Sequence, residues 1–533
     1  MKKLPKGIAT FSELIEEDYI YIDKTKDVYE MIKNGKLNFL SRPRRFGKSL
    51  LVSTLEELFK GNKELFKGLY IYDKWEWNEN YPVLRIDFTQ ISHENPEILK
   101  KSLNEYLDRI ANDFSIKLDN DIFVNKFGSL INYIYATTGK KVVVLIDEYD
   151  KAINNHLDDI DIAEENRNVL KEFYQVLKGS DRYIRFLFLT GISKFAKTSI
   201  FSDLNHVEDI TINPKFSTIC GYTQEDLETH FNEYLFNLSN DTKMSYEKLI
   251  KAIKNCYNGY SWDGMNFVYN PFSILNLFSS GEFLNYWSDS GTPELLVDIL
   301  KNTDADLNVL AKKKSEFVGS FPNFELNNMD FDTVLLQTGY LTIQKKEISP
   351  PKPPLYTTAI PNKEVEDSLF SYILGIYTNY SAEKVEPLTR SMLKYIYNQD
   401  SEGLQKSFEV LLHKIPNLIY GELKREIEAH YKILAISWLQ LLGFDIESEI
   451  MTLKGRLDAM VKHKDFYMIV EFKFSDKKSF QKMFDEAENQ IIEKGYYKPY
   501  QNKKIIVLSI AFKPRDVKCQ FKTVEETLKK YNK

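Results

Sequence analysis

Residues 37–61 read LNFLSRPRRFGKSLLVSTLEELFKG and combine, in order, an apolar stretch, a loop and an amphipathic helical stretch. A loop between a strand and a helix is the context that a phosphate-binding loop requires. In such a loop Lys48 would reach the β and γ phosphates of a nucleotide, and the Ser49 hydroxyl would hold Mg²⁺. Backbone N–H groups around Gly47 would cradle the phosphates. The stretch predicts an α/β domain built around a nucleotide site.

The loop departs from the usual G-x-x-x-x-G-K-S spacing at one position. Arg42 stands where the first glycine belongs, so the backbone must follow another path there. A Gly-Lys-Ser tripeptide is also common by chance. The loop alone is therefore weak support for a nucleotide site.

A second strand strengthens the prediction. The run KKVVVLID at residues 140–147 is typical of a strand buried on both faces, and it ends in Asp147-Glu148. Asp147 could hold Mg²⁺ through a water bound to the ion, and Glu148 could polarise the attacking water. A later strand ends in Thr190, where a polar side chain could sense the γ phosphate between the first and third strands. The expected strands of this parallel sheet are Leu37–Leu40, Val83–Asp87, Lys141–Ile146 and Arg185–Thr190.

The predicted secondary structure changes several times along the rest of the chain. From about Gly221 it becomes helical, and TQEDLETHFNEYLF opens on a Thr–x–x–Asp capping pattern. QTGYLTIQ is interpreted as a strand after a turn, and ISPPKPPLYTTAIP as a linker or exposed loop, before helices resume near Glu364. A last unit is predicted in helix–strand–strand–strand–helix–strand order. The expected domains are an ATPase-type domain, a helical lid-like subdomain, a mixed α/β connecting region and a nuclease-like α/β domain, at residues 1–215, 216–285, 286–400 and 401–533.

Composition narrows the class of protein. The chain has 533 residues, too many for one hydrophobic core, and only three cysteines, which are far apart. A disulfide framework and a zinc knuckle are not expected, nor is a membrane span or a signal peptide, so a cytoplasmic protein is expected. Residues 401–533 carry 24 Lys and Arg against 19 Asp and Glu, a net +5, which leaves –11 for the remainder of a chain whose formal charge is –6. A basic last domain fits a nucleic-acid partner, although a lysine-rich solvated surface gives the same sum.

The last domain contains a second chemical motif. Asp458 follows Gly455-Arg456-Leu457, and Glu471 and Lys473 stand in YMIVEFK at residues 467–473. Side chains alternate along a strand, so Glu471 and Lys473 would share one face. Two carboxylates from adjacent strands can hold Mg²⁺, which lowers the pKa of a bound water and stabilises charge on a scissile phosphate. An ordinary solvated Glu and Lys pair is the alternative, but the segment is apolar on both sides, where such charges are costly without a role.

Together these residues resemble the AAA-like ATPase family found with C-terminal nuclease domains of the PD-(D/E)xK type. The resemblance extends through YIDKT, RPRRFGKSL, LIDEYDKAI, FLTGISKFAKTSIFSDLNHVEDIT, CYNGYSWDG, YNPFSILN, YWSDSGTP, LLQTGYLT and IPNKEV. The arginine-rich loop is similar to that of the family, so the missing glycine is read as a family trait. The resemblance implies a nucleotide site formed by Arg44, Arg45, Phe46, Gly47, Lys48, Ser49, Leu50, Asp147 and Thr190.

For the nuclease-like domain the resemblance implies two further residues. Family members place a glutamate on the first helix near the metal, and Glu428 is the best match, with Glu422 and Glu426 as alternatives. RecB-type relatives carry a glutamine on the helix after the core strands, which corresponds to Gln490. The resemblance further implies ATP and Mg²⁺ as cofactors, DNA rather than RNA as partner, and a bacterial mobile-element or defence setting. A homo-oligomer is compatible with it, but no arginine finger can be assigned.

Three functions remain open at this point. The first is an ATPase coupled to Mg²⁺-dependent cleavage of nucleic acid, with Glu148 serving ATP hydrolysis and Asp458, Glu471 and Lys473 serving cleavage. The second is a nucleotide-dependent assembly or signalling switch whose nuclease-like domain binds nucleic acid without cutting. The third is a partner-binding scaffold that uses residues 286–400.

Overall fold

The computed structural model describes residues 1–119, 122–195, 207–289, 314–323, 326, 330–378, 391–412, 427–442, 444–452, 455–500, 502–514 and 516–531. The chain divides into two compact units. The first consists of residues 1–305 with 315–365, and the second of residues 306–314 with 366–533.

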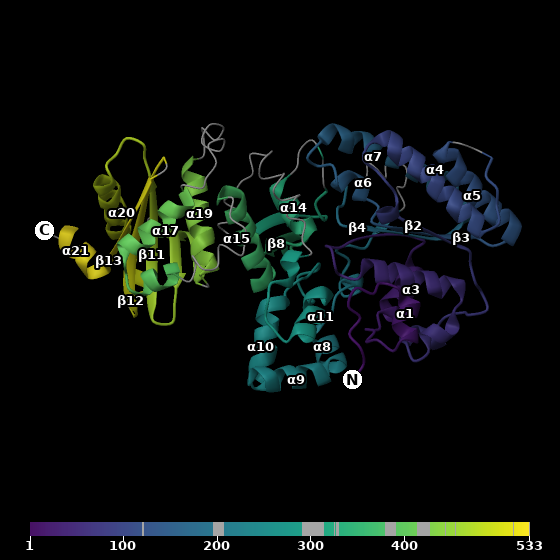
Figure 1. The fold of residues 1–533 in the computed structure, drawn as a ribbon, viewed down its shortest axis with the longest axis horizontal. Coiled ribbons are helices and arrows are strands. Elements are labelled where there is room, and N and C mark those ends of the chain that lie inside the picture. Colours follow the sequence, from purple (N-terminus) through teal and green to yellow (C-terminus); the bar gives the residue numbers. More distant parts are fainter. Residues whose placement is uncertain are drawn as a thin grey trace. The chain divides into compact units, whose positions relative to one another are not determined.

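A five-stranded parallel sheet forms the centre of the first unit (Figure 1). Its order is β2-β3-β4-β1-β5, and all neighbouring strands are parallel. The strands are β1 (Leu37–Ser41), β2 (Val83–Asp87), β3 (Val142–Asp147), β4 (Ile184–Gly191) and β5 (Glu208–Asp209). The four expected strands are confirmed, and β3 is buried along its whole length. Because β4 lies between β1 and β3, the segments that follow all three strands meet at one edge of the sheet.

Helices cover both faces of this sheet (Figure 1). On one face α3 packs on β2, β3 and β4, and α1 packs on α3. On the other face α4, α5 and α7 pack on one another, and α5 also packs on β3. The helices of this part are α1 (Phe11–Glu16), α2 (Thr25–Asn34), α3 (Lys48–Lys60), α4 (Pro96–Asp113), α5 (Phe123–Thr138), α6 (Lys151–Asn154) and α7 (Ile160–Gly179).

Four helices follow β5, as the sequence predicted: α8 (Gln224–His230), α9 (Asn232–Thr242), α10 (Tyr246–Tyr257) and α11 (Pro271–Ser280). The predicted capping pattern is confirmed, because the Thr223 hydroxyl accepts from the Asp226 N–H and the Asp226 carboxylate accepts from the Thr223 N–H. The apolar core of these helices also contains Ile20 and Ile22 from the start of the chain. The N-terminal segment and the helical subdomain therefore share one core.

A small sheet of order β6-β8-β7 completes the first unit. Its strands are β6 (Lys314–Val318), β7 (Thr342–Glu347) and β8 (Leu355–Ala359), and α14 (Phe331–Thr338) precedes β7. In QTGYLTIQ the strand begins only at Thr342, because Gln337 and Thr338 end α14 and Gly339 turns the chain with a φ of 91°. The proline-rich stretch at residues 348–361 was expected as a linker or exposed loop, and residues 348–354 do join β7 to its antiparallel neighbour β8. The expectation is wrong for Leu355–Ala359, which form β8 itself. Helix α15 (Lys363–Thr378) begins where helices were expected to resume.

The second unit is built on a sheet of order β13-β12-β11-β10-β9. Strands β11 and β12 are parallel and are joined by α20, whereas the other neighbours are antiparallel. The predicted element order is confirmed, with one more strand and one more helix at the end. The elements are α17 (Ser401–Leu412), α19 (Ile427–Leu441), β9 (Asp445–Thr452), β10 (Gly455–Lys462), β11 (Phe466–Phe474), α20 (Phe480–Lys494), β12 (Lys504–Lys513), β13 (Asp516–Thr523) and α21 (Val524–Tyr531).

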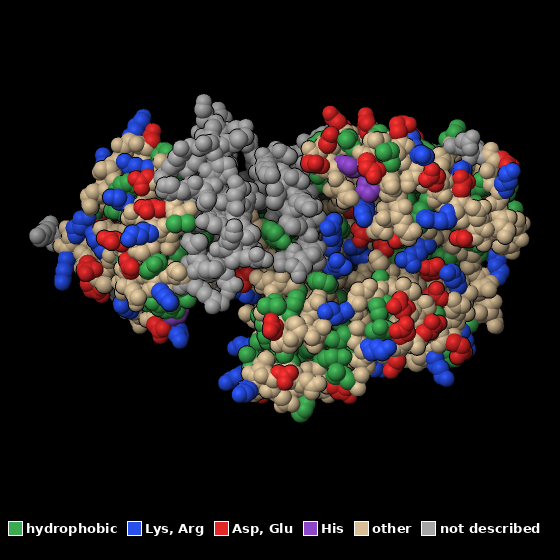
Figure 2. All heavy atoms as spheres, viewed as in Figure 1, with side chains coloured by type: hydrophobic (Ala, Val, Ile, Leu, Met, Phe, Trp, Pro, Cys, Tyr) green, Lys and Arg blue, Asp and Glu red, His purple; other side chains and the backbone are tan. Residues whose placement is uncertain are grey.

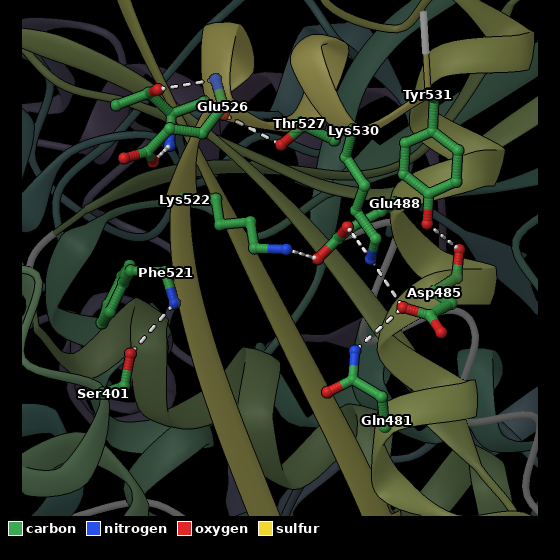
Figure 3. A network of polar contacts seen from close by, with 11 residues as sticks. Ser401, Gln481, Asp485, Glu488, Phe521, Lys522, Glu526, Thr527, Lys530 and Tyr531 are labelled. Carbon is green, nitrogen blue, oxygen red and sulfur yellow. Dashed lines mark hydrogen bonds and ion pairs between the residues drawn. The ribbon is translucent and has the colours of Figure 1, made fainter. Parts of the chain in front are cut away.

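A polar network fixes α20 against β13 and α21 (Figure 3). The Glu488 side chain is 1% exposed and forms ion pairs with Lys522 of β13 and Lys530 of α21. Lys530 also pairs with Asp485, whose carbonyl accepts from the Tyr531 hydroxyl. A buried carboxylate with two ammonium partners is well satisfied, so this network holds the helix that carries Gln490 in a defined position.

The surface charge of the second unit is mixed. Figure 2 shows basic and acidic side chains interspersed on its visible face. The net +5 of this part of the chain is therefore not gathered there into a patch of one sign. Among the described residues, no helix is both long enough and apolar enough to span a membrane.

Candidate nucleotide and nuclease sites

The predicted phosphate loop connects β1 to the first residue of α3, Lys48. Gly47 is the N-cap of α3 and has a φ of 93°, a left-handed conformation that suits glycine. Arg45 also has a positive φ, 69°, which is uncommon for a residue with a side chain. The loop thus makes a tight turn directly into a helix N-terminus, where free backbone N–H groups and the helix dipole favour an anion.

Lys48 lies at the centre of this loop and is almost fully buried. Its Nζ donates to the carbonyl oxygens of Arg42 and Pro43 at 3.1 and 3.2 Å. Its Nζ also lies 3.4 Å from Oε1 of Glu148. The structure therefore brings together the lysine and the glutamate that the sequence proposed for one site.

Asp147 and Ser49 also meet here, since the Ser49 hydroxyl is hydrogen-bonded to the Asp147 carboxylate. Burial raises the pKa of Asp147 to about 6, the negative charge of Glu148 adds to the rise, and Ser49 and Lys48 oppose it. Thr190 lies at the predicted strand end, but its fully buried hydroxyl donates to the Leu40 carbonyl at 2.8 Å. Thr190 of β4 is thus hydrogen-bonded to β1, and it is not among the residues that line the cavity of this site.

The position of the missing glycine has a structural explanation. Arg42 is fully buried, and its guanidinium lies 3.9 Å from the ring centre of Trp262. Burial lowers the pKa of Arg42 to about 10, so the group remains charged at neutral pH. Phe46 packs edge-on against Tyr260 and Trp262, with ring centres 4.8 and 5.2 Å apart. The guanidinium donates to the backbone carbonyls of Ser41, Thr211 and Phe216. The loop is therefore held by the segment after α10, and these partners could not be predicted from sequence spacing.

A cavity of about 640 Å³ opens beside the loop. Its polar lining includes Lys48 and Glu148, and its apolar lining includes Ile8, Ile22 and Leu275. The predicted nucleotide residues of the loop all line it: Arg44, Arg45, Phe46, Gly47, Lys48, Ser49 and Leu50. The Arg45 guanidinium lies 5.0 Å from the ring centre of Phe272 on α11. A cavity lined both by charged groups and by apolar side chains has the chemistry that a nucleotide requires.

In the second unit the structure brings Asp458, Glu471, Lys473 and Gln490 together. Lys473 Nζ lies 3.3 Å from Glu471 Oε2 and donates to Gln490 Oε1 at 2.8 Å. Glu471 and Lys473 therefore share one face of β11, as the alternation predicted. The Asp458 carboxylate accepts from the backbone N–H of Phe472 at 3.0 Å. Because these side chains come from β10, β11 and α20, their contacts depend on the fold of the whole unit.

Lys432 on α19 is a site residue that the sequence reasoning missed. Its Nζ lies 2.7 Å from Asp458 Oδ1, and the two side chains are 16% and 20% exposed. Glu428 lies four positions earlier on α19, one helical turn away, but its side chain is outside the described part of the structure. The side chain of Arg456 and the whole of Glu422 and Glu426 are also outside it. The spacing of Glu428 and Lys432 was the one signal that could have drawn attention to Lys432.

The pKa values of the two carboxyl groups are shifted in opposite directions. Burial raises the pKa of Glu471 well above its ordinary value, the Asp458 charge adds to the rise, and Lys473 opposes it. Burial alone would raise the pKa of Asp458 as well, but Lys432 and the Phe472 N–H outweigh it and hold that pKa below its ordinary value. The site thus favours the protonated form of Glu471 and the ionised form of Asp458.

The residues present fit a hard divalent cation in part. Oε1 of Glu471 is buried and has no hydrogen-bond partner among the described residues, as expected for an oxygen that awaits a ligand. Asp458 supplies a second carboxylate. No group of three or more His, Cys, Asp or Glu side chains that could hold a metal was found in the described ranges, and the third predicted carboxylate, Glu428, is outside them. Oxygen ligands of this type suit Mg²⁺ when water and phosphate complete the coordination.

Comparisons with known proteins agree with this architecture. Residues 5–201 match the family described as predicted AAA-ATPase, and residues 426–522 match the PD-(D/E)XK nuclease superfamily. An "Uncharacterized protein in vnfD 5'region" of Azotobacter chroococcum mcd 1 is 37% identical over 503 residues, which cover 94% of each chain.

Solved structures give a much weaker likeness. A chain in the structure of the Drosophila ORC bound to poly(dA/dT) DNA and Cdc6 is similar with a TM-score of 0.23 and 10% identity, over 81% of this chain and 66% of that one. The corresponding complex with GC-rich DNA gives a TM-score of 0.22 and 9% identity, over 81% and 67%. Scores this low carry no argument about fold or ligand.

The two family matches cover the parallel-sheet domain and the C-terminal sheet domain, and the relative matches nearly the whole chain. The chain therefore belongs to the family of AAA-ATPase-like proteins that end in a domain of the PD-(D/E)XK nuclease superfamily.

Proposed function

We propose that this protein binds and hydrolyses ATP with Mg²⁺ in its first unit, and that the nucleotide state controls Mg²⁺-dependent cleavage of nucleic acid, DNA in preference to RNA, by its second unit. The observation that carries the proposal is the cluster of Asp458, Glu471, Lys473 and Gln490, in which every member contacts another member or a partner that fixes it. A surface without a function would not bury a carboxylate beside a second carboxylate.

Each residue of the nuclease-like site has a role in this proposal. Asp458 and Glu471 would hold the cation, which would lower the pKa of a bound water and stabilise charge on the scissile phosphate. Lys473 would assist deprotonation of the water or neutralise the developing phosphate charge, and its contact with Gln490 fixes the ammonium in position. Glu428, one helical turn before Lys432, would add a third carboxylate.

The first unit would bind the phosphates of ATP at the loop and the base against the apolar side chains that line the cavity. Lys48 would leave the carbonyls of Arg42 and Pro43 to reach the β and γ phosphates. Ser49 and Asp147 would hold Mg²⁺ directly or through water, and Glu148 would polarise the attacking water. Release of Lys48 from Glu148 on nucleotide binding would free that glutamate for its role.

The test is cleavage of labelled single-stranded, double-stranded and circular DNA, and of RNA, by the full chain with Mg²⁺ and with or without ATP. Asp458→Ala serves as the inactive variant. Glu447→Gln, which removes a carboxylate paired with Lys462 on the neighbouring strands β9 and β10, serves as the matched control. Cutting that needs Mg²⁺ and Asp458 but not Glu447 supports the proposal. Cutting that persists in Asp458→Ala rejects it.

A nucleotide-dependent switch that binds nucleic acid without cutting is the second candidate. The contacts of Arg42 and Phe46 with Trp262 favour it, because they connect the phosphate loop directly to the segment after α10. That segment is in turn bonded to β7 through Ser261 and Thr342. Tight ATP binding with negligible turnover, and no cleavage of any substrate, would be the outcome expected of a switch.

A further inference from the structure

In the nuclease-like site, an ammonium group of the protein itself lies beside Asp458, where a metal ion is expected. Lys432 Nζ lies 2.7 Å from Asp458 Oδ1, in a contact that is largely shielded from water. The other oxygen of Asp458 accepts from the Phe472 N–H. Both oxygens of the predicted metal ligand are therefore engaged by donors on this chain.

The charges of the site also balance without a metal. Asp458 and Glu471 carry at most two negative charges, and Lys432 and Lys473 carry two positive charges. Glu428 would leave at most one net negative charge. Sites that bind a divalent cation firmly hold a larger excess of carboxylate, because the ion must replace its hydration shell with anionic ligands. A cation that approached Asp458 here would meet Lys432 at short range.

We propose that Lys432 competes with the metal for Asp458, so that the divalent cation binds firmly only together with a phosphodiester. This inference rests on the proposed function and specifies how its site is loaded. The phosphate supplies the negative charge that the site lacks, and it gives the Lys432 ammonium a new partner when Asp458 turns to the cation. The protein would then take up its metal with its substrate, and cleavage would not require a site that is already loaded.

The alternative for Lys432 is a purely structural ion pair that fastens α19 to β10. The two roles make different predictions. Loss of a structural pair loosens the site and weakens metal binding, whereas loss of a competing cation strengthens metal binding in the absence of nucleic acid. Direct metal binding separates these roles without reference to cleavage.

The experiment is calorimetric titration of Mn²⁺ into the full chain, with and without a short single-stranded DNA whose phosphorothioate linkages resist cleavage. Lys432→Met removes the charge and keeps most of the side-chain volume, and Lys432→Arg keeps the charge. Lys462→Met, which removes the partner of Glu447 on the same sheet, is the matched control. Binding that remains in Asp458→Asn belongs to other sites, including the nucleotide site, and is subtracted. Hydrogen exchange over residues 455–474 shows that each variant keeps its fold.

Without DNA, Lys432→Met is expected to bind Mn²⁺ about tenfold more tightly than the unaltered chain, since a unit charge a few ångströms away is removed. Lys432→Arg and Lys462→Met are expected to behave like the unaltered chain. DNA should tighten Mn²⁺ binding strongly in the unaltered chain and much less in Lys432→Met. Equal or weaker binding in Lys432→Met, or firm binding that ignores DNA in the unaltered chain, would overturn this inference alone. No Mn²⁺ binding at Asp458 under any condition would overturn the metal-dependent function as well.

Discussion

The opposite pKa shifts of Asp458 and Glu471 predict unequal effects when each carboxyl group is replaced by its amide. Asp458→Asn removes the negative charge that lies 2.7 Å from Lys432 Nζ. The side chains of Lys432 and Asp458 are 16% and 20% exposed. A charged hydrogen bond in such a place contributes about 2 kcal/mol, so the second unit should lose about that much stability. Glu471→Gln replaces a carboxyl whose uncharged form is favoured by burial with an uncharged group of the same shape. It should change stability by about 0.5 kcal/mol or less.

The stability of the second unit should also depend on pH in opposite directions for the two carboxyl groups. Folding raises the pKa of Glu471 above its ordinary 4.5, so above that pH the native state binds more protons than the unfolded state. The stability of the unit therefore falls as pH rises from 4.5 toward the folded pKa, and Glu471→Gln removes this fall. Asp458 has a lowered pKa, so its contribution is complete above 3.8 and is lost only as pH drops through the folded value.

The assay is hydrogen exchange of the peptides that cover β10 and β11 in the full chain, because their local opening reports the stability of the second unit. Both variants should also lose cleavage by at least about a hundredfold, since each removes an anionic metal ligand. The reasoning is refuted if Glu471→Gln destabilises these strands by more than about 1 kcal/mol, or if Asp458→Asn leaves them unchanged. Either result would mean that the charges are distributed differently between the two carboxyls.

Four further outcomes follow from the two sites. Lys48→Met should weaken ATP binding by at least about tenfold in a titration with a fluorescent ATP analogue, and unchanged affinity would contradict the placement of the phosphates. Glu148→Gln should keep ATP binding and lower steady-state hydrolysis by about a hundredfold or more, so normal turnover would exclude Glu148 as the group that polarises water. Because the pKa of Asp147 is about 6 and only the ionised carboxylate favours Mg²⁺, the Mg²⁺ dependence of ATP binding should weaken as pH falls from about 7 to 5, and a flat profile would argue against Asp147 in the metal site. Gln490→Ala should lower cleavage by about ten- to a hundredfold with Mn²⁺ affinity unchanged, because it frees the Lys473 ammonium without touching a carboxylate, whereas lost metal binding would give Gln490 a different role.

Local patterns were enough to predict much of the fold. The Val, Leu and Ile run of β3, the Thr223 and Asp226 cap and the alternation of Glu471 and Lys473 all depend on near neighbours in the chain. Strand β13 has a comparable signal, since Val517, Cys519 and Phe521 alternate with polar residues.

The partners of single polar residues could not be predicted in the same way. Lys432 has the composition of an ordinary helix surface, and its contact with Asp458 exists because α19 and β10 fold together. The Thr190 hydroxyl, predicted to sense a phosphate, donates to the Leu40 carbonyl, 150 residues away, and so connects two strands. Such contacts depend on tertiary packing, so sequence spacing alone does not identify the partner.

The burial of Arg42 sets a limit on how this protein can be cut into pieces. A fragment that ended at residue 215 would retain the guanidinium but lose the Phe216 carbonyl and the Trp262 ring that cover it. Phe46 would also lose both of its aromatic neighbours, Tyr260 and Trp262, and its apolar surface would be exposed to water. Such a truncated ATPase fragment should therefore aggregate or refold poorly, while a fragment that extends through residue 365 keeps every one of these contacts. The nucleotide-binding half of this protein is a unit of expression only together with the segment that holds its phosphate loop.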